Sequence, residues 1–112
     1  MDAVPAAEKA DPMSAYRTIN PATGETVAEF PVLAAADVEG IVARSARAYK
    51  TFRVLPLTDR TKVLKRAAEL HRERIDELAA ILTLEVGKPI AQARGEVELV
   101  ASIYEYYADN AA

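Results

Sequence analysis

From Ala34 onward, apolar residues recur three and four positions apart, which is the spacing of one face of an α-helix. This pattern predicts three amphipathic helices. The first ends at Pro56, because proline cannot continue a helix. The second runs from Thr58 to Gly87, and the third begins at Pro89. Their apolar stripes are Val38, Ile41, Val42, Ser45, Tyr49 and Phe52; then Leu64, Ala67, Ala68, Ile75, Leu78, Ala79, Leu82 and Val86; then Ile90, Ala93, Val97, Val100, Ala101, Tyr104 and Ala108.

The second and third predicted helices meet at a sharp corner. Gly87 can adopt the left-handed conformation that closes a helix C-terminus, and Pro89 suits the first turn of the next helix. Thr58 is the expected N-cap of the second helix, with Asp59 in its first turn. The third helix shows no C-terminal signal, so we expect the helical region to be truncated at its C-terminus.

Before the helices, two short β-prone runs flank a turn sequence. Asn20 begins the turn, Pro21 presets φ at the next position, and Gly24 closes it where φ is positive. The pattern predicts a β-hairpin. Because a two-stranded ribbon is marginal alone, we expect other elements to cover one of its faces.

The predicted elements give the chain three parts. Residues 1–15 show no periodicity and are expected to form a disordered tail, because they cannot bury enough apolar surface to become ordered. The β-hairpin follows at residues 16–33, and the helices occupy residues 34–112. A chain of 112 residues has the size of one domain.

Composition excludes several classes of function. The net charge is −3, and basic residues are interleaved with acidic ones, which argues against a nucleic-acid-binding surface. Cysteine is absent, so disulfides, thiolate metal sites and cysteine nucleophiles are excluded for this chain. There is neither a basic start followed by an apolar run nor a stretch of eighteen apolar residues, so we expect a soluble, cytoplasmic protein without a membrane partner.

Glu96 lies on the unexpected side of the third helix. A rotation of about 100° per residue places it opposite the other charges, beside Val100, Ile103 and Tyr107. Burying a lone carboxylate is costly, so Glu96 should find a cation, backbone N–H groups or a metal, or accept a raised pKa. The expected solvent face is formed by Arg94, Glu98, Glu105 and Asp109.

Four polar residues of the second helix also face its apolar side. Hydrogen bonds or ion pairs between helices are the favoured explanation, and a binding or catalytic role is the alternative. A lone histidine without a second histidine or cysteine nearby is more often a packed residue than a metal ligand. The four are Arg60, His71, Arg74 and Glu85.

Other residues invite chemical interpretations that their context disfavours. Lys88 could act as a nucleophile, but we expect an exposed junction residue without an apolar pocket. Glu85 and Glu96 could form an acid–base pair, but they lie on different helices. Tyrosines 104, 106 and 107 could stack on a ligand, but their helical spacing favours packing.

Several motifs, taken as a set, resemble the N-terminal region of NAD(P)-dependent aldehyde dehydrogenases. The turn at residues 20–25 (Asn-Pro-Ala-Thr-Gly-Glu) resembles the family's opening hairpin, and residues 46–49 (Ala-Arg-Ala-Tyr) its first helix. Arg60 and Leu64 occupy positions where the family usually has arginine and leucine. Residues 83–89, 95–97 and 106–108 resemble the boundary and far end of the next helices. A tryptophan that is usual after the first helix is replaced here by Arg53 or Val54.

The resemblance implies an α/β parent fold, of which this chain covers the hairpin and three helices that open the coenzyme-binding domain. It implies an oxidoreductase that converts an aldehyde to its acid with NAD or NADP. Residues 83–89 and 107–111 are similar to succinate-semialdehyde dehydrogenases. The catalytic and coenzyme-binding residues of the family lie outside these 112 positions, so no such residue is assigned here. The partners implied are the remainder of the polypeptide and further copies in a homo-oligomer.

Some family members hold a structural monovalent cation between backbone carbonyls of the first strand and an acidic side chain of a later helix. The matching positions are Thr18, Ile19 and Glu96.

Two hypotheses therefore remain. The chain is the N-terminal fragment of an aldehyde dehydrogenase and is inactive alone, because a covalent thiol route needs a cysteine. Alternatively, it is a free-standing helical module for protein interaction.

Overall fold

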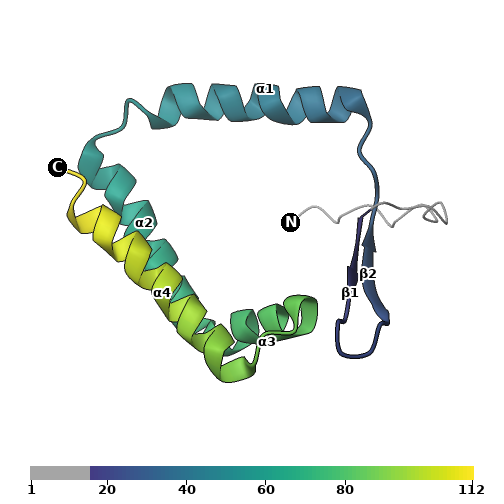
Figure 1. Cartoon of the computed structure of the whole chain (residues 1–112). Helices are drawn as coiled ribbons and strands as arrows, with labels where there is room; N and C mark the ends of the chain where they lie inside the picture. The colour runs from purple at the N-terminus through teal and green to yellow at the C-terminus, as the bar shows by residue number, and fades with distance from the viewer. Residues whose placement is uncertain (1–15) are drawn as a thin grey trace.

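The computed structural model describes residues 16–112, so the predicted tail at residues 1–15 lies outside the described residues. In this part of the chain, a two-stranded hairpin precedes four helices that form an open arrangement rather than a closed bundle (Figure 1). The elements are β1 (Tyr16–Ile19), β2 (Thr26–Phe30), α1 (Ala35–Phe52), α2 (Leu57–Glu73), α3 (Ile75–Val86) and α4 (Ile90–Asp109).

The predicted hairpin is confirmed. The two strands are antiparallel, with Tyr16 opposite Phe30. The Asn20 carbonyl accepts a hydrogen bond from the Gly24 N–H at 2.8 Å, and the Asn20 side chain accepts one from the Ala22 N–H at 2.9 Å. Gly24 has a φ of 76°, the left-handed conformation that the turn requires of this position.

The expectation of one continuous helix from Thr58 to Gly87 is wrong. The backbone leaves the helical region at Arg74 (φ −112°, ψ 23°), which ends α2 and begins α3, so four helices follow the hairpin instead of three. His71 and Arg72 lie in the last turn of α2, while Asp76 lies in the first turn of α3. This charge reversal suits the dipoles of two separate helices. The break carries neither glycine nor proline, which is why the apolar spacing did not reveal it.

The helix ends agree only in part with the sequence. Gly87 closes α3 with a φ of 71°, as predicted. Thr58 is not an N-cap: α2 begins at Leu57 after Pro56, without a side-chain cap. The Thr58 carbonyl instead accepts a hydrogen bond from the Thr61 hydroxyl at 3.1 Å. No capping side chain therefore accepts a hydrogen bond from the first N–H groups of α2.

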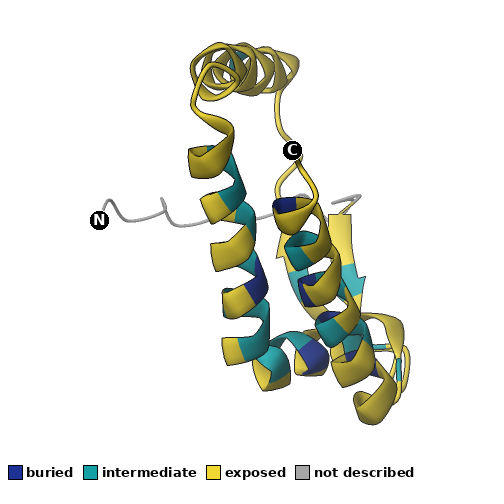
Figure 2. Cartoon of the chain, turned by 90° about the vertical axis from the view of Figure 1, so that its left-hand side faces the viewer, coloured by how far each residue is buried: buried dark blue, intermediate teal, exposed yellow. Residues whose placement is uncertain are grey.

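The core consists of small side chains between α4 and its two neighbours. Helices α2 and α3 both pack against α4, so the buried residues follow one face of α4, with one buried residue on each of α2 and α3 (Figure 2). Short side chains let the backbones approach closely, and nothing larger than valine is buried among residues 16–112. The buried residues are Ala68, Ala79, Ala93, Val97, Ala101 and Ala108.

Helix α1 stands apart from this core. It bridges from β2 to α2 along one side of the molecule (Figure 1), and none of its residues is buried. Its predicted apolar stripe is therefore present but largely exposed in the described part of the chain. The radius of gyration is 18.1 Å, compared with about 13 Å for a compact 100-residue domain. The exposed stripe consists of Val38, Ile41, Val42, Tyr49 and Phe52.

Candidate functional site

The corner between α3 and α4 contains the residues that the sequence singles out. Gly87 turns the chain, and the Lys88 carbonyl accepts a hydrogen bond from the Thr83 hydroxyl at 2.8 Å. The Lys88 ammonium pairs with the carboxylate of Glu96, which lies in the second turn of α4. Both side chains are partly buried, 34% and 40% exposed respectively. Lys88 is thus a paired, half-buried residue, and the expectation that it is exposed is wrong.

Glu96 has the cationic partner that the sequence predicts, but its side chain is only partly buried. It lines a cavity of about 220 Å³ between α3 and α4, together with Val97 and Val100. The cavity is smaller than the 300 Å³ or more that is typical of a small-molecule site. It is therefore a packing defect or a place for a side chain rather than a coenzyme pocket. Of the neighbours expected for Glu96, Ile103 and Tyr107 remain exposed.

The hairpin lies against this same corner. The Thr18 hydroxyl donates a hydrogen bond to Glu85 Oε1 at 3.3 Å. A Cβ added to Gly87 would lie 3.0 Å from Pro21 Cγ, so the turn of the hairpin approaches the glycine closely. The helix corner therefore covers part of the hairpin, as its marginal stability requires.

The predicted cation ligands have different partners in the structure. Thr18 contacts Glu85, while Glu96 pairs with Lys88. Ile19 is 39% exposed. Within residues 16–112, no three histidine, cysteine or acidic side chains are grouped so as to hold a metal ion. The predicted cation site at Thr18, Ile19 and Glu96 depends chiefly on backbone oxygens and stays a prediction.

His71 has the structural role that the sequence favours. Its Nδ1 lies 2.7 Å from the Ala67 carbonyl, and because a carbonyl only accepts, Nδ1 carries the proton. The ring also packs on Tyr104 with a centroid distance of 5.3 Å. Tyr104 is likewise a packing residue, whereas Tyr106 and Tyr107 contact each other edge to face and are mostly exposed.

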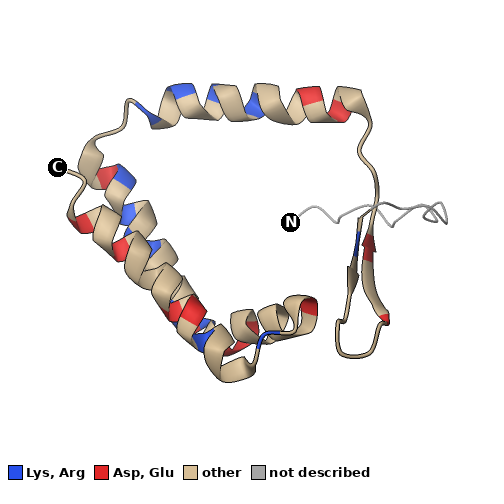
Figure 3. Cartoon of the chain, viewed as in Figure 1, with Lys and Arg blue, Asp and Glu red and all other residues tan. Residues whose placement is uncertain are grey.

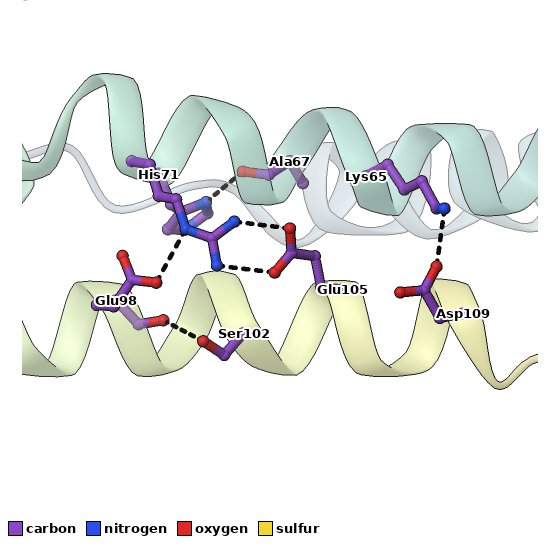
Figure 4. Close-up of polar contacts among 8 residues, drawn as sticks. Lys65, Ala67, His71, Glu98, Ser102, Glu105 and Asp109 are labelled. Carbon is purple, nitrogen blue, oxygen red and sulfur yellow. Dashed lines mark hydrogen bonds and ion pairs between the residues drawn. The ribbon is translucent and has the colours of Figure 1, made fainter.

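Helices α2 and α4 are joined by a row of ion pairs, which we call the α2–α4 seam. Arg72 donates through Nε to Glu98 at 2.9 Å and through both Nη atoms to Glu105 at 2.7 and 2.8 Å (Figure 4). Lys65 pairs with Asp109 at 2.7 Å. The hydrogen bonds that Arg72 donates hold the pKa of Glu105 below its usual value, and the hydrogen bond that Lys65 donates to Asp109 raises the pKa of Lys65.

The predicted solvent face of the third helix is about half exposed, as expected of it, but its residues are also paired. Glu98, Glu105 and Asp109 are paired with α2, and Arg94 pairs with Asp76 of α3 at 2.7 Å. Helical phase alone could not show this, because the four residues lie at the edge of the helix interface, where long side chains reach a partner. The sequence did not single out Arg72, because its place in the last turn of α2 follows from the break at Arg74.

The four polar residues assigned to the apolar side of the second helix differ in how far they are buried. His71 and Arg60 are partly buried, as predicted. Arg74 and Glu85 are exposed, because the break after α2 changes the direction of the following helix. Glu85 and Glu96 bind different partners and form no acid–base pair.

On the packed helices, basic residues lie mainly on α2 and acidic residues mainly on α4, so opposite charges face each other across the α2–α4 seam (Figure 3). Helix α1 differs: Asp37 lies in its first turn and Lys50 in its last, as its dipole favours. Arg53 extends this basic end and lies 5.9 Å from the Tyr49 ring centroid. Within residues 16–112, no helix has the length and apolar character needed to cross a membrane.

Comparisons with known proteins show which proteins this chain is similar to. Residues 7–112 match the aldehyde dehydrogenase family. The chain is 46% identical to succinate-semialdehyde dehydrogenase [NADP(+)] of Deinococcus radiodurans over 97% of its length, and 35% identical to glutarate-semialdehyde dehydrogenase of Pseudomonas putida over 91%. It spans only 23% and 21% of those two proteins.

The fold agrees with the sequence match. The crystal structure of succinic semialdehyde dehydrogenase from Streptococcus pyogenes in complex with NADP+ superposes with a TM-score of 0.81 at 35% identity. That superposition covers 86% of this chain and 21% of the other. The hairpin, the corner at Gly87 and the packed helices thus occur together in a solved dehydrogenase. The chain belongs to the aldehyde dehydrogenase family.

Proposed function

We propose that the chain is the N-terminal part of an NAD(P)-dependent aldehyde dehydrogenase that oxidises a semialdehyde to its carboxylic acid. The observation that carries this proposal is the 46% identity to a succinate-semialdehyde dehydrogenase, because it extends over 97% of the chain. Succinate semialdehyde is therefore the substrate we propose first, and NADP the coenzyme. Glutarate semialdehyde, one methylene longer, is the competing substrate that a second relative suggests.

The chain itself supplies a scaffold rather than reacting groups. Oxidation through a thiohemiacetal needs a cysteine thiol, and the sequence contains none. The polar residues at the helix corner and the seam have structural partners: Glu96 pairs with Lys88, and Arg72 with two glutamates. The catalytic thiol and the coenzyme contacts must come from the rest of the polypeptide.

The uncovered apolar surface supports the same proposal. The stripe on α1 is exposed although its spacing is that of a buried helix face. Large apolar patches of this kind mark surfaces that are covered by other protein. The remainder of a dehydrogenase polypeptide would supply that cover.

The test is coenzyme reduction by the intact polypeptide. We expect NADPH to form with succinate semialdehyde, more slowly with glutarate semialdehyde, and not at all with the 112-residue chain alone. Failure of the intact protein to oxidise either compound would refute the proposed substrate class. Activity of the 112-residue chain, freed of host enzymes, would refute the division of roles.

We also propose the monovalent cation site at Thr18, Ile19 and Glu96 for the intact protein. The Lys88 ammonium and a monovalent ion would bind the same carboxylate of Glu96. The residues therefore fit a monovalent ion only if the pair between Lys88 and Glu96 is broken. Homo-oligomerisation and a cytoplasmic location complete the proposal.

The alternative is a free-standing helical module that binds another protein. The exposed α1 stripe favours it equally, because a binding surface is also uncovered in isolation. The two hypotheses differ in stability: a free-standing module must fold cooperatively alone, whereas a part of a dehydrogenase need not.

A further inference from the structure

Arg60 carries a buried polar atom that has no partner in the described part of the chain. The residue lies in the first turn of α2, and its Nε is shielded from solvent without a hydrogen-bond acceptor among residues 16–112. A buried donor on a charged group is costly to leave unpaired. Native proteins supply almost all such donors with an oxygen atom.

Arg60 lines a cavity of about 330 Å³ where three elements meet. Phe52 ends α1, Leu57 and Leu64 belong to α2, and Tyr107 comes from the last turn of α4. These walls are mainly apolar, so a charge inside the cavity would be weakly screened by water. The site therefore combines apolar packing space with one unsatisfied cationic donor.

The neighbouring carboxylates are already engaged. Asp59, next to Arg60 in the sequence, pairs with Lys62 at 2.8 Å. Asp109 pairs with Lys65, and Glu105 with Arg72. None of these three carboxylates pairs with Arg60 in the structure.

The end of the described chain lies at the same place. Ala111 lines the cavity, and with Ala112 it lines a second cavity of about 180 Å³ beside Leu57 and Thr61. Figure 1 shows the C-terminus close to the start of α2. The chain spans only 23% of the Deinococcus radiodurans relative, so most of an intact dehydrogenase lies outside this stretch. An extended chain advances about 3.3 Å per residue, so a polypeptide continuing past Ala112 can reach the cavity within a few residues.

We infer that Arg60 binds a carboxylate of the segment that directly follows Ala112 in the intact protein. The guanidinium takes that carboxylate through Nε and one Nη in a bidentate pair, and an adjacent apolar side chain of the segment fills the cavity. Arg60 thereby anchors the polypeptide where it leaves α4. This inference rests on the proposed function, because it requires an intact dehydrogenase that continues past this position.

Hydrogen–deuterium exchange of the intact protein, read by mass spectrometry, tests the anchor. Arg60→Met keeps the apolar stem and removes the donors, so peptides directly following Ala112 should exchange at least about tenfold faster, while peptides of α2 and α4 stay unchanged. Arg74→Met, which removes an exposed arginine at the end of α2, is the matched control and should change neither. Equal exchange after Ala112 in wild type and Arg60→Met would overturn the inference. So would faster exchange confined to α2 and α4, since Arg60 would then only pack the helices.

If Arg60→Met does not fold, Arg60→Lys is read by the same criteria, because lysine keeps the charge but lacks the Nε–H. A crystal structure of the intact wild type decides independently. A carboxylate of the following segment on Arg60 supports the inference, and an ion, a water molecule or a second copy of the chain in its place overturns it. Coenzyme reduction by the same wild-type sample keeps the two proposals apart: an active enzyme without the anchor refutes only the inference.

Discussion

Arg72 connects two helices through charged hydrogen bonds whose strength depends on pH. Because Arg72 lowers the pKa of Glu105, the pair stabilises the fold above the ordinary carboxyl pKa of 4.5, and this contribution is lost as the pH falls through the lower folded value. Lys65 behaves in the opposite sense. Asp109 raises its pKa, so that contribution is present below 10.5 and is lost as the pH rises through the higher folded value.

Arg72→Met should therefore lower the melting temperature at neutral pH by a few degrees. Below pH 4.5, the melting temperature of the variant should decrease less steeply with falling pH than that of the wild type. The measurement is a series of thermal melts of the intact protein across that range. Arg47→Met, which alters an exposed residue of α1, is the control and should retain the acid dependence. An acid limb that is unchanged in Arg72→Met would show that the seam does not respond to pH in this way.

Glu96 is the residue at which an internal ammonium and the proposed cation compete. If a monovalent cation binds there, the intact wild type should become more stable as K⁺ replaces a bulky organic cation at constant ionic strength. Glu96→Gln should lose this response, and it should also lose up to about 1 kcal/mol from the partly exposed pair with Lys88. A wild type that does not distinguish the two cations would leave Lys88 as the sole partner and contradict the cation site.

The hairpin and the helix corner each contain a glycine with positive φ, and the two elements meet at Gly87. Gly87 and Gly24 both have positive φ, but only Gly87 has a close neighbour, since a Cβ there would lie 3.0 Å from Pro21. Gly87→Ala should therefore destabilise the intact protein by about 1–2 kcal/mol from backbone strain alone, and further through the displaced hairpin. Urea unfolding is the measurement.

Two other glycines serve as controls for that substitution. Gly24→Ala has the same backbone strain in open space, so it should cost less than Gly87→Ala. Gly95→Ala lies within α4 with nothing near its Cβ and should stabilise by up to about 1 kcal/mol. Equal losses for Gly24→Ala and Gly87→Ala would show that the hairpin does not depend on the bare glycine.

The elements also show which parts of the fold the sequence could predict. The turn at Asn20 and Gly24 and the corner at Gly87 follow from local backbone preferences, so they were predictable. The break at Arg74 was not, because it depends on α2 and α3 each packing against α4 and lacks a glycine or proline. Glu96 was found from helical phase, but its partner Lys88 was not, since only the folded corner brings the two together.

The whole molecule is an open frame whose buried residues are alanine and valine. Small side chains bury little apolar area each, so the packing of α2 and α3 on α4 provides limited stabilisation. The stripe on α1 contributes nothing while it is uncovered. This chain therefore depends on further polypeptide of the aldehyde dehydrogenase for a complete core.

Thermal unfolding of the isolated 112-residue chain, followed by far-ultraviolet circular dichroism and calorimetry, tests that claim most directly. We expect a helical spectrum with a broad, weakly cooperative loss of signal, because the helices form while α1 is uncovered and the hairpin is covered only in part. A sharp transition of a monomer, with equal calorimetric and van't Hoff enthalpies, would contradict the account and favour a free-standing module.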